Sequence, residues 1–370
     1  TAALLALCFP DIDLGWLAWI SLVPLLVSLS GKKLHYAFFL SYLCGLAFFP
    51  GIGNWLFQVH GYKLLHHLIW GAYLAIYFGV FGLAFSFISK RWGVAPSLAA
   101  SPFLWVSLEY LRSNMGFMAF PWGLLSHSQH QYPRIIQVAS LAGNFGVSFL
   151  VVWVNAALAA LILLYSHPSP SKYSARQAFI FVAIGGALVI SALGYGHGIV
   201  SKTIIGKEIR VSVVQGNIDQ KMKWEPQHAN SIMQTYADLT REVSMDRPDL
   251  IVWPEAATPR AITIDGRLYG QVKDIAAKAG TYLLLGSTHQ DKVRTGGQGR
   301  FKYANSAFLI SPDRKDKDKR YDKIRLLPFG EYLPMKEIIP WSYIRIPDPG
   351  SYTPGQEFTM FESSGCRFGV

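Results

Sequence analysis

The sequence predicts a bundle of membrane-spanning helices over residues 1–200, followed by a water-exposed α/β domain over residues 201–370. Of the 370 residues, 51% are hydrophobic and only 15% are charged, whereas soluble domains carry about 25% charged residues. Residues 1–200 contain three acidic and nine basic residues, and every other Asp and Glu follows them. After residue 209, short apolar segments alternate with segments of helical periodicity, which predicts strands and helices packed in layers.

The first 200 residues contain several apolar segments, and a spanning helix needs about 20 apolar residues. The predicted spans are a partial helix at 1–9, then 15–30, 36–59, 64–89, 94–111, 136–165 and 178–197. The 15–30 segment is short, which favours a tilted or irregular helix. The chain begins without Met inside an apolar run, so we expect the first helix to be truncated.

The basic residues between the predicted spans are unevenly distributed. One set of alternate loops carries the pairs Lys32 and Lys33, Lys90 and Arg91, and Lys172 and Arg176. The opposite loops carry Lys63, Arg112 and Arg134, with Asp11 and Asp13 before the second span. Loops rich in Lys and Arg stay in the cytoplasm. The α/β domain is therefore expected on the extracytoplasmic side of the membrane.

Composition excludes several other classes of protein. The net charge is +11, but no run of basic residues with interleaved aromatics predicts nucleic-acid binding, and a basic excess also suits anionic lipid. Cys8, Cys44 and Cys366 are scattered and form neither a disulfide framework nor a CxxC site. His127 and His130 lack a third ligand, so no metal site is expected.

Glu109 and Arg112 lie at the end of the 94–111 span. A carboxylate inside a membrane is a candidate functional group because its burial is costly. The two residues are three apart and share one helical face, so the alternative is an interfacial ion pair that anchors the helix end.

The α/β domain shows a regular order of elements. Strands are predicted at 209–216, 249–255, 281–289 and 303–310, and helices at 227–243 and 267–280, the second closed by a Gly. Active residues in such folds lie at the ends of strands and in loops.

Three polar residues lie where structure alone does not require them. Glu255 ends the strand 249–255, and Lys323 and Glu331 flank a segment bent by Pro and Gly. A carboxylate can act as a general base, and an ammonium can stabilise an oxyanion. Together they could activate a nucleophile such as a Cys thiolate. The alternatives are a helix-terminal charge for Glu255 and a surface role for Lys323.

These residues occur in motifs that resemble the bacterial apolipoprotein N-acyltransferases, membrane-embedded members of the nitrilase (carbon–nitrogen hydrolase) superfamily. The motifs are VVQGNIDQKMKW (213–224), WPEAATP (253–259) and YDKIRLLPFGEYLP (321–334), with GNW (53–55), LEYLR (108–112) and FPWG (120–123) in the membrane part. The resemblance covers essentially the whole chain. It implies a nitrilase-like αββα sandwich for residues 201–370.

The resemblance also implies a Glu–Lys–Cys triad without a metal or an organic cofactor. Glu255 matches the family's general base, and Lys323 matches its oxyanion-stabilising lysine. Glu331 matches an additional active-site glutamate, and Trp224 matches a tryptophan that handles substrate.

In the family, the nucleophilic cysteine follows an apolar strand. The last four residues of this sequence, RFGV, resemble the beginning of that strand. We therefore expect the nucleophile beyond Val370, an α/β domain incomplete at its C-terminus, and no turnover by the chain as it stands. Cys366 precedes that strand and is not expected to be the nucleophile.

The implied reaction takes an acyl chain from a membrane phospholipid, forms a cysteine thioester, and acylates the α-amino group of a diacylated apolipoprotein. The implied partners are those two substrates and the lipid bilayer of the bacterial inner membrane, with no nucleic acid, and the protein is expected to be a monomer. Alternatives are a membrane-anchored amidohydrolase and a non-catalytic membrane protein with a relic domain. Residues 335–352 are predicted to form a loop that gates the site, the alternative being ordinary packing.

Overall fold

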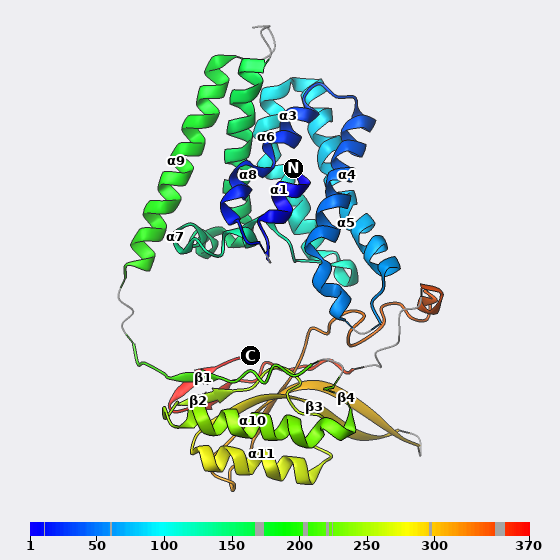
Figure 1. The fold of residues 1–370 in the computed structure, drawn as a ribbon, viewed down its shortest axis with the longest axis vertical. Helices are drawn as coiled ribbons and strands as arrows, with labels where there is room; N and C mark the ends of the chain where they lie inside the picture. Colours follow the sequence, from blue (N-terminus) through cyan, green and yellow to red (C-terminus); the bar gives the residue numbers. More distant parts are fainter. Residues whose placement is uncertain are drawn as a thin grey trace. The chain divides into compact units, whose positions relative to one another are not determined.

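The computed structural model describes residues 1–10, 12–59, 61–166, 174–202, 206–219, 222–223, 225–295, 298–344 and 352–370. The chain forms two compact units (Figure 1). The helical unit contains residues 1–57 and 62–204, and the α/β unit contains residues 58–61 and 205–370.

The helical unit consists of helices of very different lengths. Its long helices are α4 (Leu34–Ile52), α5 (Leu64–Trp92), α6 (Val94–Asn114), α8 (Ala139–Ser166) and α9 (Ala175–Val200). Its short helices are α1 (Ala2–Leu7), η1 (Gly15–Leu17), α2 (Ala18–Ser21), α3 (Val23–Leu29), η2 (Asn54–Gln58), η3 (Gly116–Met118), η4 (Leu125–Gln129) and α7 (Pro133–Ile136). Among the described residues, α4, α5, α8 and α9 are long and apolar enough to cross a membrane.

Three predicted spans differ from the observed helices by more than a few residues at an end or in their regularity. The predicted 36–59 span is too long, because α4 ends at Ile52 after Pro50 in its last turn. The 15–30 segment divides into η1, α2 and α3, as its short length suggested. The 136–165 span is bent near its start, where Gly143 has φ 64, a left-handed conformation that suits glycine.

Glu109 and Arg112 are both buried, with 5% and 3% of their surfaces exposed. The ion pair that was the alternative reading is not found among the described residues, where both side chains instead bind the segment that follows α6. Glu109 Oε1 accepts a hydrogen bond from Leu125 N at 2.7 Å. Arg112 Nη1 donates to the carbonyls of Phe120 at 2.8 Å and Trp122 at 2.6 Å. The pair thus satisfies backbone groups between α6 and the start of η4, away from water.

The α/β unit has a five-stranded mixed sheet of order β1-β2-β3-β4-β5 in its described part. The strands are β1 (Val211–Val213), β2 (Leu250–Val252), β3 (Tyr282–Thr295), β4 (Gln298–Ile310) and β5 (Lys319–Asp322). β1, β2 and β3 are parallel, while the β3–β4 and β4–β5 pairs are antiparallel. The remaining elements are η5 (Pro226–His228), α10 (Ala229–Ser244), α11 (Gly266–Ala279), η6 (Trp341–Ile344) and the hairpin of β6 (Phe361–Ser363) with β7 (Cys366–Phe368).

Both faces of the sheet are covered. Figure 1 shows α10 and α11 together on one face, where Leu283 and Leu285 of β3 pack in the core shared with both helices. The intervening residue, Leu284, points to the opposite face and packs with Phe361 of the C-terminal hairpin. This alternation follows from the two-residue period of a strand. The α/β unit therefore has three layers: the two helices, the sheet and the C-terminal hairpin.

The structure confirms the predicted fold class of a helical membrane bundle and an α/β domain. The predicted order of strands and helices also matches the observed order in the α/β unit. The predicted strands 209–216 and 249–255 are too long, since only three residues of each pair in the sheet. The residues beyond β2 leave the sheet to form a loop that carries Glu255.

Candidate active site

The loop that carries Glu255 is tied to the neighbouring strand β3 by its backbone. Gly286 N donates to the Pro254 carbonyl at 3.2 Å, and Ala257 N donates to the Gly286 carbonyl at 2.8 Å. Ala256, between these bonds, has φ 48, a conformation that is uncommon for residues other than glycine. The peptide on either side of Glu255 is therefore held in a fixed turn.

Trp253 anchors the same loop to helix α10. It is 2% exposed, its indole nitrogen donates to the Thr240 hydroxyl at 2.9 Å, and its ring stacks on Tyr236 with centroids 4.8 Å apart. A buried Trp needs such a partner for its N–H. The anchored Trp253 thus fixes the backbone two residues before Glu255.

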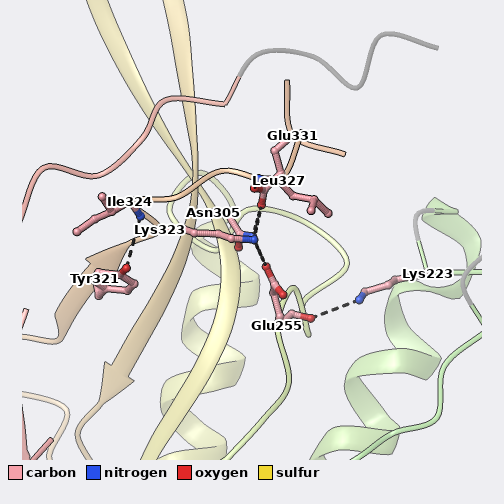
Figure 2. A network of polar contacts seen from close by, with 8 residues as sticks. All are labelled: Lys223, Glu255, Asn305, Tyr321, Lys323, Ile324, Leu327 and Glu331. Atoms are coloured by element: carbon pink, nitrogen blue, oxygen red, sulfur yellow. Dashed lines mark hydrogen bonds and ion pairs between the residues drawn. The ribbon is translucent and has the colours of Figure 1, made fainter. Parts of the chain in front are cut away.

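Lys323 and Glu331 lie in the segment after β5. Lys323 N donates to the Asn305 carbonyl at 2.8 Å, and its own carbonyl accepts from Gly355 N at 3.0 Å. Glu331 Oε2 accepts from Leu327 N at 2.6 Å, which closes the segment bent by Pro and Gly on itself. Both side chains are directed to the same point (Figure 2).

The structure brings Glu255, Lys323 and Glu331 together. Lys323 Nζ lies 3.2 Å from Glu255 Oε1 and 3.1 Å from Glu331 Oε1. The exposed fraction of the side chain is 64% for Glu255, 32% for Lys323 and 10% for Glu331. The site therefore has one open carboxylate, one buried carboxylate and an ammonium that bridges them.

The electrostatics of the site favour its charged forms. Burial alone would raise the pKa of Glu255, but hydrogen bonds from Asn305 and Lys323 and the positive charge of Lys323 lower it below its ordinary value. Burial would lower the pKa of Lys323, but its bonds to the two carboxylates raise it instead. Near neutral pH, Glu255 is thus an anion and Lys323 a cation.

Asn305 of β4 is a member of the site that the sequence analysis missed. Its side-chain nitrogen donates to Glu255 Oε1 and, at 2.7 Å, to Glu331 Oε1. A single Asn inside an apolar strand has no motif of its own. The available signal was a polar side chain in the predicted strand 303–310 on the same face as Ala307 and Leu309.

A second lysine lies beside Glu255. Lys223 Nζ is 3.4 Å from the backbone carbonyl of Glu255 (Figure 2), and burial lowers the pKa of Lys223 although the Glu255 charge opposes this. Trp224, the predicted substrate-handling residue, lies outside the described residues. In the described ranges, no three His, Cys, Asp or Glu side chains gather to hold a metal ion.

Cys366 is located away from the three site residues. It is the first residue of β7 and pairs with Ser363, whose hydroxyl donates to the Asp249 carbonyl at 3.2 Å. Asp249 precedes β2, whereas Glu255 follows it. The sulfur is therefore near the opposite end of β2 from the carboxylate.

Gly286 of β3 is required by the close approach of the Glu255 loop. A Cβ at this position would lie 2.6 Å from Glu255 Cα and 2.7 Å from Ala256 N. We expect Gly286→Ala to displace Glu255 and to lower kcat/KM for the reaction of the site by about 10²-fold, the cost of a displacement of about 1 Å. Steady-state kinetics of the complete gene product would measure this.

Gly270→Ala provides the matched control for this prediction. Gly270 lies within α11, and nothing is within 4 Å of its added Cβ. This variant should keep the wild-type kcat/KM, with a stability equal to or slightly above that of the wild type. Wild-type kinetics in Gly286→Ala would contradict the proposed steric role.

Comparisons with known proteins identify both parts of the chain. The family described as apolipoprotein N-acyltransferase N-terminal domain matches residues 1–157, and carbon-nitrogen hydrolase matches residues 210–370. An apolipoprotein N-acyltransferase from Geobacter metallireducens is 32% identical over 378 residues, covering 100% of this chain and 70% of that protein. The Pasteurella multocida protein of the same name is 28% identical, covering 90% of this chain and 63% of its own length.

Among solved structures, the chain shows a weak likeness to an amidase from Nesterenkonia sp. AN1 crystallised with acrylamide. The TM-score is 0.30 at 14% sequence identity, over 46% of this chain and 57% of the amidase. The family is shown instead by the two successive family matches and by the 32% identity along the whole chain. This chain belongs to the apolipoprotein N-acyltransferase family, with an α/β unit of the carbon–nitrogen hydrolase superfamily.

Proposed function

We propose that Glu255, Lys323 and Glu331 carry out the acyl transfer of lipoprotein N-acylation. The observation that carries this proposal is the Lys323 ammonium, held 3.2 Å and 3.1 Å from an exposed and a buried carboxylate. The apolar helices long enough to span a membrane and the relatives named apolipoprotein N-acyltransferase support lipid-anchored substrates.

In the first step, a cysteine thiol, which the family resemblance implies, attacks the ester carbonyl of a membrane phospholipid. Glu255 accepts the thiol proton as general base. The Lys323 ammonium stabilises the negative charge on the carbonyl oxygen. The ester C–O bond then breaks, a thioester remains on the cysteine, and the leaving lysophospholipid alcohol takes the proton from Glu255.

In the second step, the α-amino group of the diacylated N-terminal cysteine of an apolipoprotein attacks the thioester. Glu255 accepts a proton from the amine, and Lys323 again stabilises the oxyanion. The C–S bond breaks, the amide forms, and the proton returns to the thiol. The exposed position of Glu255 suits this role because a base must reach two different substrates, while buried Glu331 holds Lys323 in place.

Several further features belong to the same proposal. The basic pairs in alternate loops support an extracytoplasmic α/β unit, and we propose a monomer in which Trp224 handles substrate. Trp341 packs on Phe329 with ring centroids 5.1 Å apart, while Tyr343 remains 85% exposed. We propose that this part of segment 335–352 contacts lipid and gates the site; its residues 345–351 lie outside the described ones.

The test is to supply the complete gene product, in phospholipid vesicles, with a synthetic diacylated lipopeptide that has a free N-terminus. We expect N-acylated peptide and lysophospholipid in equal amounts, measured by mass spectrometry. Free fatty acid without N-acylated peptide would instead identify a hydrolase, the amidohydrolase alternative. No consumption of phospholipid would favour a relic domain.

A further inference from the structure

We infer that Asn305 is a positioning residue, which fixes the orientation of the Glu255 carboxylate and selects Oε2 as the oxygen that accepts the substrate proton. This inference rests on the proposed general-base role of Glu255. It concerns a residue of β4, outside the Glu–Lys–Glu set that the motifs identify.

The first observation is the pattern of donors around the two carboxylates. Lys323 Nζ and Asn305 Nδ2 each donate to Oε1 of Glu255 and to Oε1 of Glu331. Two donors therefore bridge the same two oxygens, and both side-chain N–H bonds of Asn305 are used. Figure 2 shows Lys323 and Asn305 converging on the carboxylates from the same side.

The second observation is which oxygen of Glu255 remains available. Every side-chain hydrogen bond that the described residues make to Glu255 is to Oε1. An oxygen that already accepts two hydrogen bonds is a poor proton acceptor, so the proton goes to Oε2. Because 64% of the Glu255 side chain is exposed, a substrate can approach that oxygen.

The third observation is the rigid support of Asn305 itself. Asn305 pairs with Thr288 within the β3–β4 hairpin, and its carbonyl accepts from Lys323 N at 2.8 Å. One residue therefore positions the base through its side chain and the oxyanion donor through its backbone. Sites on strands hold such geometry better than sites on loops.

An amide suits this position better than a second cation. It stabilises the Glu255 anion by hydrogen bonding, which contributes to the lowered pKa of that carboxyl. It adds no net charge, so it opposes proton uptake by the base less than another ammonium would. Asn305 thus keeps Glu255 ionised before the reaction and still lets it be protonated during the reaction.

The test compares Asn305→Ala and Asn305→Asp with the wild type in the complete gene product. The measurement is the pH profile of kcat/KM for phospholipid consumption, with melting temperatures to assess folding. Loss of the donor raises the pKa of Glu255, so the acid limb should move up by about one pH unit. We expect kcat/KM to fall by about 10- to 100-fold on the plateau of the profile, because the carboxylate is no longer held in its productive orientation, and by more on the shifted acid limb.

Asn305→Asp tests the same inference without a change in size. It replaces the donor by a third carboxylate, so kcat/KM should fall further in Asn305→Asp than in Asn305→Ala. The matched control is Ser306→Ala, on the next residue of β4, which loses a hydrogen bond to Asp322 but no site contact. Its pH profile should equal that of the wild type.

An unshifted acid limb in both Asn305 variants would overturn the inference, and so would loss of folding in both, which would make the residue structural. Failure of the proposed function looks different. If the wild type releases free fatty acid and no N-acylated peptide, the transferase assignment fails. The pH profile of that release would still show whether Asn305 positions the base.

Discussion

Lys323→Met is expected to lower kcat/KM for acyl transfer by about 10³-fold or more, since removing a single oxyanion donor costs about 10²–10³-fold. The loss should exceed that range because Lys323 also separates two anions. Its Nζ lies within 3.2 Å of Glu255 Oε1 and 3.1 Å of Glu331 Oε1. Without it, the repulsion between the carboxylates raises the pKa of Glu255 and turns the base towards solvent.

The pH dependence distinguishes these two effects in Lys323→Met. A lost oxyanion donor lowers the rate equally at all pH values, whereas a raised Glu255 pKa lowers it most in acid. We expect both effects in Lys323→Met. The rate should be lower than that of the wild type at every pH, and the acid limb should move to higher pH. Lys323→Arg keeps the charge, but a planar guanidinium does not reproduce the ammonium geometry. We therefore expect Lys323→Arg to lack most of the wild-type activity as well. Lys278→Met, at the end of α11, is the control and should retain wild-type rates.

Glu255→Gln is expected to lower kcat/KM by about 10²–10⁴-fold, the contribution of a general base. The amide is isosteric, and its oxygen can still accept from Lys323 and Asn305, so the fold should be retained. Because the pKa of Glu255 is lowered, the wild-type base stays ionised well into acid, and activity falls only as the pH approaches that lowered value. In Glu255→Gln this acid limb should disappear.

The control for this variant is Glu242→Gln, at an exposed position of α10. It removes the same charge from the unit and should leave both the rate and the acid limb unchanged. A Glu255→Gln enzyme with more than one tenth of the wild-type rate would show that another group takes the proton.

The sequence indicated much of this architecture because its strongest signals are local. Uneven charge and long apolar segments predicted the helical unit, and α5 differs from its predicted span 64–89 only by ending at Trp92. The ends of other elements were less predictable. α4 ends at Ile52, two residues after Pro50, and hydropathy alone does not indicate this end, since membrane helices often tolerate Pro.

Some residues of the site could likewise be predicted from the sequence, and one could not. Glu255 follows a buried strand and Lys323 lies in a recognisable motif, so both could be named from their sequence context. Asn305 could not, because its role depends on pairing between β4 and β5, which joins Ser306 to Asp322. Such a contact is set by the fold of the whole sheet, and a polar side chain in the predicted strand 303–310 does not by itself indicate it.

The register between β4 and β5 also links the site to the folding of the domain. Glu255, Asn305 and Lys323 come from three segments, and the carboxylate and the ammonium are separated by 68 positions in the sequence. A shift of β5 by one residue would turn Lys323 to the opposite face of the sheet. The reactive group of charges therefore exists only after all three segments have paired correctly. A partly folded domain therefore has no assembled site with which to attack an acyl ester.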